Sequence, residues 1–243
     1  MMALLLALTL GFAPGLIWLA FFLKEDVHPE PRAMIAKVFF IGGLSAFFAY
    51  VLEFYSKDLF GGYSFIINGL SEANLTPFLG FAVIEEIVKF LFVWSAIRKS
   101  PYFDEPIDAM IYMVTGALGF ATAENFFIVL DNSVGQAFNV ILLRFVGATL
   151  LHALSSAILG YMWAWGMKKK SLPFYLFGGI IFASFFHSIF NILVYSFNNL
   201  LIYPTVFLAA IGFVVLYDFE KLRKEEIQEE SQHKLTPFLS DKT

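Results

Sequence analysis

The sequence predicts an all-α fold, a polytopic bundle of about seven transmembrane helices with the N-terminus outside and the C-terminus in the cytoplasm. Of the 243 residues, 59% are hydrophobic and only 15% are charged, against roughly 25% charged residues in soluble domains. The apolar residues form repeated runs of about 20, the length that a helix needs to cross a hydrocarbon core about 30 Å thick. These two observations indicate a multi-pass membrane protein.

Seven crossings are expected, and turn or charge signals mark most of the breaks between them. The first run, MMALLLALTLGFAPGLIWLAFFL, lacks the charged n-region of a signal peptide, so we interpret it as a retained helix. Prolines in KEDVHPEP (24–31) and RKSPYFDEP (98–106), and the turn residues of DNSVGQ (131–136), separate later runs. The expected crossings are 2–23, 32–54, 75–97, 107–130, 138–166, 172–197 and 200–217.

The basic residues predict the orientation of these crossings. Lysine and arginine gather at 24–32, 98–99, 168–170 and 221–224, which lie on alternate connections. Basic connections stay in the cytoplasm, so the N-terminus is expected outside. We expect a membrane-embedded domain over 1–217 and a charged cytoplasmic tail over 218–243, helical at first and then disordered.

Composition excludes several classes of site and partner. The chain has no cysteine, which excludes disulfides, thiolate metal sites and cysteine nucleophiles. No basic arm or patch suggests nucleic acid, so the lipid bilayer is the partner that composition predicts.

A few polar residues stand inside the predicted crossings, and we expect them to face protein or water. The stretch FAVIEEIVKFLF (81–92) carries three charged residues at its centre, and each costs about 2.5 to 3.5 kcal/mol there. Residues four apart share one face of a helix, as Glu85 and Lys89 do. The full set comprises Glu85, Glu86, Lys89, Glu124, Asn125, Arg144, His152, Ser155, Ser156, His187 and Asn191.

The depths of these residues are compatible with one buried layer. At a rise of 1.5 Å per residue, the glutamates and histidines of four crossings lie roughly 9 to 21 Å below the outer surface.

Several of these residues can have a structural role instead of a chemical one. Lys89 can neutralise Glu85, and Arg144 can snorkel or pair with Asp131 near the outer interface. The two serines and the two asparagines can join helices.

Two ways of activating water fit this set of residues. In the first, His152, His187 and one glutamate, with Glu86 as the first choice, hold a divalent metal such as zinc. Another glutamate then acts as general base. In the second, no metal is needed, because a desolvated glutamate takes a proton from water while a histidine and an asparagine stabilise the oxyanion. Both routes stay open on the residues alone. A serine nucleophile is the poorer fit, since it leaves three glutamates unexplained.

Four short motifs on separate crossings resemble a known family. EEIVK (85–89), GFATAEN (119–125), LHALSSAILGY (151–161) and HSIFN (187–191) are similar, in order and spacing, to the PrsW family of intramembrane proteases. The motifs are distantly similar to those of the CAAX-prenyl-protease superfamily as well. That superfamily has a histidine where this chain has Glu124, and an arginine near Lys89.

The resemblance implies an endopeptidase of the plasma membrane, grouped with metalloproteases, that cleaves membrane-anchored proteins in regulated proteolysis. Anti-sigma factors are one substrate class that it suggests. Carried over by position, the catalytic residues are Glu85, Glu86, Glu124, His152, His187 and Asn191.

Two rival functions fit the same polar residues. Buried glutamate, histidine and arginine side chains also suit the proton relay of a proton-coupled transporter, although no inverted repeat is visible in the sequence. A non-catalytic scaffold, in which the polar cluster only holds helices together, is the second rival.

Overall fold

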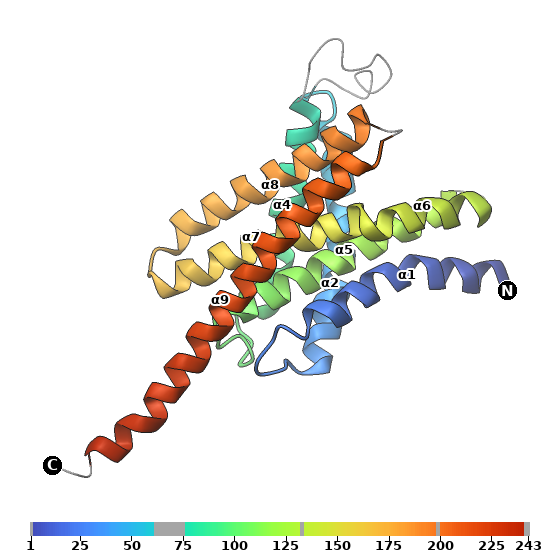
Figure 1. Cartoon of the computed structure of the whole chain (residues 1–243). Helices are drawn as coiled ribbons and strands as arrows, with labels where there is room; N and C mark the ends of the chain where they lie inside the picture. The colour runs from blue at the N-terminus through green and yellow to red at the C-terminus, as the bar shows by residue number, and fades with distance from the viewer. Residues whose placement is uncertain (1, 61–75, 132–133, 198–199, 241–243) are drawn as a thin grey trace.

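The computed structural model describes the backbone of residues 2–60, 76–131, 134–197 and 200–240, with the side chains placed at 9–60, 76–130, 135–197, 200–229 and 231. The described residues form helices and no strand, which confirms the all-α prediction (Figure 1). The helices are α1 (Met2–Phe22), α2 (Arg32–Ser56), α4 (Thr76–Ile97), α5 (Asp108–Asp131), α6 (Val134–Val146), α7 (Ala148–Lys168), α8 (Leu172–Ser196) and α9 (Ile202–Ser240).

Among the described residues, five segments are long and apolar enough to cross a membrane, as the prediction of a multi-pass protein requires. They are Arg32–Ser56, Asp108–Leu130, Gly135–Lys168, Leu172–Ser196 and Ile202–Glu229. Helix α4 has 22 residues, but it carries Glu85, Glu86 and Lys89 near its centre, so composition alone does not mark it as a span. The protein is therefore a multi-pass membrane protein, while the number seven and the orientation stay predictions.

Helix α5 lies at the centre of the bundle and packs against α1, α2 and α7. Every residue from 107 to 122 is buried. A helix that is buried all round must be apolar all round, and this stretch holds only Asp108, Thr115 and Thr122 as polar residues. Since α5 contacts helices on several sides, it fixes where the polar residues of its neighbours meet.

Glycines allow α2 and α5 to approach each other closely. A Cβ atom on Gly42 would overlap the carbonyl oxygen of Gly116, and one on Gly119 would overlap the carbonyl oxygen of Phe39. Small residues at helix crossings are the usual means of close packing in membranes.

One predicted helix is divided in the structure, and the last helix is longer than predicted. The expected single helix over 138–166 is divided into α6 and α7 at Gly147, although hydrogen bonds from Gly147 N–H to Leu143 (2.9 Å) and from Leu151 N–H to Gly147 (2.9 Å) continue across the break. A mid-helix glycine is a common site for such a bend. Helix α9 runs on to Ser240, so the helix of the last crossing continues into the tail, as expected, and is longer than the short stretch predicted.

Ion pairs gather the connections that carry the basic residues at one end of the bundle. His28 Nδ1 lies 2.8 Å from Glu105 Oε1, and Lys168 Nζ lies 2.7 Å from Glu225 Oε2. The loop after α1, the loop before α5, the end of α7 and the charged part of α9 therefore lie on the same side. This is the alternation on which the predicted orientation depends.

Replacing Gly119 by alanine tests the α2–α5 contact. The added methyl group forces the helices apart, and overpacking of this kind costs about 1–3 kcal/mol. We expect Gly119→Ala to lower the unfolding temperature in detergent by several degrees. Gly212→Ala is the matched control, because its Cβ would meet nothing within 4 Å. Equal unfolding temperatures for the two variants would contradict the close approach.

Candidate active site

Polar side chains from four helices meet inside the bundle. Glu85 and Glu86 come from α4, Glu124 from α5, His152 from α7 and His187 from α8. Glu86, His152 and His187 are buried, with at most 3% of each residue exposed. The buried layer expected from depth along the sequence is therefore present as a cluster of contacting residues.

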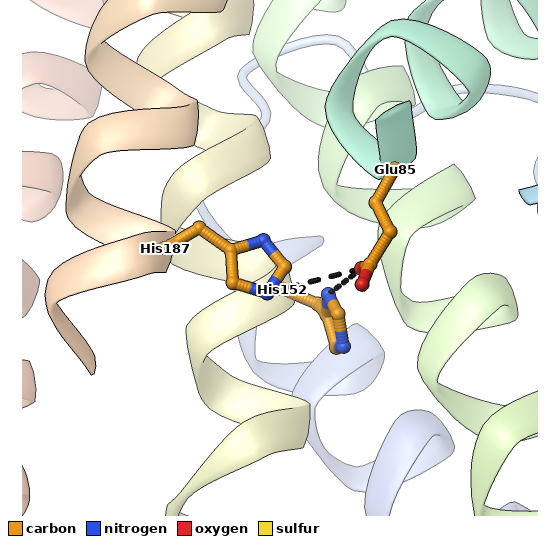
Figure 2. Close-up of side chains that lie close together, drawn as sticks. All are labelled: Glu85, His152 and His187. Carbon is orange, nitrogen blue, oxygen red and sulfur yellow. Dashed lines mark ion pairs between the residues drawn. The ribbon is translucent and has the colours of Figure 1, made fainter. Parts of the chain in front are cut away.

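Glu85 faces the two histidines at the centre of this cluster. Its Oε2 atom lies 3.8 Å from His152 Nδ1 and 3.8 Å from His187 Nε2, and Figure 2 shows both imidazoles beside the carboxylate. This oxygen is buried and has no hydrogen-bond partner among the described residues. A buried carboxylate oxygen without a partner is costly, so the centre has unused capacity to bind a proton, a water or a cation.

Each histidine is oriented by a second carboxylate on its far side. His187 Nδ1 lies 2.9 Å from Glu86 Oε1, and His152 Nε2 lies 2.8 Å from Glu124 Oε2. A carboxylate accepts the ring N–H, which leaves the other ring nitrogen with a lone pair. In both rings that other nitrogen is the one that faces Glu85. Histidines that ligate metals are commonly held in this way.

Glu86 has its hydrogen-bonding capacity filled by the protein. Its Oε1 atom accepts hydrogen bonds from Lys89 Nζ (2.7 Å) and Ser155 Oγ (3.0 Å), besides its contact with His187. Its Oε2 atom accepts a hydrogen bond from Ser156 Oγ (3.3 Å). Glu85, rather than the expected Glu86, is thus the glutamate between the two histidines.

Lys89 is fully buried and lies among three site residues. Its Nζ atom is 2.7 Å from Glu86 and 3.9 Å from Glu85, so the nearer partner is Glu86 rather than the expected Glu85. It also lies 3.0 Å from His152 Nδ1 and 4.8 Å from the centre of the Phe120 ring. A positive charge therefore stands beside one of the two nitrogens that face Glu85.

The residues present fit a divalent metal. Glu85, His152 and His187 each offer one ligand atom, and these atoms all lie within 4.8 Å of one another. Two imidazoles and one carboxylate make up a common hydrolytic zinc site. The buried, unpartnered oxygen of Glu85 is the atom of this structure that most favours a cation, and Lys89, close to His152 Nδ1, is the group that competes with one.

Two residues that the motifs did not select lie next to the cluster, and one predicted site residue makes no hydrogen bond to it. Glu53 of α2 lies within hydrogen-bonding reach of Glu85, and Arg144 of α6 contacts Glu124. Helical spacing could have indicated Glu53, since it lies on the same face of α2 as the buried Ala46 and Ala49. Asn191 is half-buried one turn after His187, and its side chain has no hydrogen bond among the described residues.

Comparisons with known proteins identify the family of this chain. The model of the PrsW family, described as intramembrane metalloproteases, matches residues 30–217. Protease PrsW of Geobacillus kaustophilus is 28% identical over 210 residues, which cover 85% of this chain and 87% of the relative. Protease PrsW of Bacillus subtilis is 28% identical over 220 residues, which cover 88% and 94%. No solved structure matches.

Removing the buried ammonium tests the ion pair on which the cluster is built. Lys89→Met leaves Glu86 charged and buried without its cation, a change that costs about 3–5 kcal/mol. We expect a large fall in the unfolding temperature, partly recovered when Glu86→Gln is added. Lys224→Met, which removes a lysine whose side chain is 67% exposed and paired with Glu220, should cost less than about 1 kcal/mol. Similar losses in the two lysine variants would contradict the role of Lys89.

Proposed function

Because the chain belongs to the PrsW family of intramembrane metalloproteases, we propose that it hydrolyses peptide bonds at the centre formed by Glu85, His152 and His187. Membership of this family makes the chain a protease and favours neither the transporter nor the scaffold. The observation that carries the proposal is the Glu85 Oε2 atom, which is buried, has no hydrogen-bond partner among the described residues, and lies 3.8 Å from both imidazoles.

The three central residues would hold a divalent metal such as zinc. A bound zinc ion supplies Lewis acidity and lowers the pKa of its water toward neutrality. The protein orients the ligands and provides a buried environment. Glu86 and Glu124 hold the N–H groups of the two imidazoles, so that their lone pairs face the reacting side. Burial of the cluster excludes bulk water, which strengthens each of these electrostatic interactions.

A route without metal uses the same residues, and the position of Lys89 is compatible with it. The lysine ammonium stands 3.0 Å from the His152 nitrogen that a metal would need. In this route Glu85 takes a proton from water, and Lys89 stabilises the negative charge that develops on the scissile carbonyl oxygen. We also propose a role beside that carbonyl for Asn191, which lies one turn from His187 on α8.

We propose membrane-anchored proteins as substrates, with anti-sigma factors as one class. The motifs that resemble the PrsW family support this choice, and the position of the site within the helix bundle supports it too. Residues 1–217 would form the protease domain in the plasma membrane, and residues 218–243 would form a cytoplasmic tail.

Single substitutions test the proposed centre. We expect Glu85→Gln and His187→Ala to lower cleavage of a membrane-anchored reporter in proteoliposomes by about 10²–10⁴-fold, because each removes a group that acts on the water. Glu220→Gln is the control, since Glu220 is partly exposed and pairs with Lys224 far along α9. Cleavage at the wild-type rate by both site variants, at equal protein levels, would overturn the proposal.

A further inference from the structure

Arg144 contacts two residues of α5, whereas the side chain of Asp131, its expected partner, lies outside the described side chains. Its Nη2 group donates to Glu124 Oε2 at 2.8 Å, and its Nε group donates to Asn125 Oδ1 at 2.6 Å. The side chain is 19% exposed. Two acceptors on neighbouring residues of α5 hold the planar guanidinium in one orientation, which a single ammonium group would not reproduce.

Glu124 connects Arg144 to His152, one of the three residues of the proposed centre. The oxygen that accepts from Arg144, Glu124 Oε2, also lies 2.8 Å from His152 Nε2. An oxygen that accepts from a guanidinium acts as an acceptor toward its second partner as well, so the ring nitrogen donates. His152 Nδ1 then carries the lone pair, and this nitrogen is the one that faces Glu85 Oε2 at 3.8 Å.

Other contacts hold the helices around Arg144 in place. Trp18 of α1 donates its indole N–H to the Phe145 carbonyl oxygen at 2.7 Å, and the two rings stack with centroids 5.6 Å apart. The buried Asn125 donates to Thr149 Oγ1 at 3.2 Å, which joins α5 to α7. The docking of α6 therefore does not depend on the arginine alone, and the guanidinium is available for a role at the site.

We propose that Arg144 is a positioning residue of the hydrolytic centre. It holds the Glu124 carboxylate where that carboxylate fixes the His152 ring, with the proton on Nε2 and the lone pair on the side of Glu85. Arg144 acts through Glu124 and does not itself touch the reacting atoms. The inference rests on the proposed function, in which His152 belongs to the centre.

Kinetics of three arginine variants test this role. We expect Arg144→Gln to lower kcat by about 10–100-fold, as the loss of an outer partner of a site histidine does, with KM and the unfolding temperature close to wild type. The kcat of Arg144→Lys should lie between those of Arg144→Gln and wild type, because lysine keeps the positive charge but cannot form the two hydrogen bonds of the planar guanidinium. Arg223→Gln, which removes an arginine paired with Glu220 on α9, should match wild type. A wild-type kcat in both Arg144 variants, or a loss confined to KM, would overturn the inference.

A second measurement reads the histidine directly. The chain has only four histidines, so ¹⁵N spectra of the purified protein can be assigned by the signal that His152→Gln removes. We expect His152 to carry its proton on Nε2 in the wild type, because Nε2 faces Glu124 and Nδ1 faces the Lys89 ammonium at 3.0 Å. In Arg144→Gln the tautomer should stay, and the Nε2 signal should shift because its hydrogen bond to Glu124 weakens. An unchanged Nε2 signal in that variant would overturn the positioning role, even if kcat falls.

Glu85→Gln, assayed in parallel, separates the two proposals. If Glu85→Gln is inactive while Arg144→Gln cleaves normally, only the role of Arg144 is wrong. If Glu85→Gln cleaves at the wild-type rate, the proposed centre is wrong and the inference about Arg144 falls with it.

Discussion

The ion pair between Lys89 and Glu86, at 2.7 Å in the middle of α4, is the interaction on which the rest of the site depends. Charged side chains at the depth of a bilayer need partners from the protein. Here the partners come from α7, through Ser155 and Ser156, and from α8, through His187. Helix α4 therefore becomes stable in the bundle only when it packs against those two helices with its charged face inward.

The three glutamates of the cluster differ in their surroundings, and that difference gives them different tasks. Glu86 is satisfied by four donors, and Glu124 is shared between Arg144 and His152. Each of these two holds one imidazole from behind. Glu85 is left with a buried oxygen that has no hydrogen-bond partner in the part of the chain that the structure describes. Buried polar networks are stable when every member is satisfied, so the one unsatisfied atom is where water or a cation is expected to bind.

Much of this arrangement follows from the sequence. Apolar runs of membrane length predict the helices, and residues four apart predict which polar side chains share a face. The sequence could not distinguish Glu85 from Glu86, because neighbouring residues differ by about 100° around a helix and only the packing of α7 and α8 decides which one is enclosed. The contacts of Arg144 with Glu124 and Asn125 could not be predicted for a related reason. Its distance along the chain put it near the interface, and the bend at Gly147 that separates α6 from α7 was not expected.

Locating the metal tests the central claim most directly. Crystals of the active enzyme, measured at wavelengths on both sides of the zinc absorption edge, would show where a bound zinc ion lies. We expect one anomalous peak between Glu85 Oε2, His152 Nδ1 and His187 Nε2, and no peak there in crystals of His187→Ala. A peak at another place in the active enzyme, with none among these three residues, would contradict the metal centre proposed for this protein.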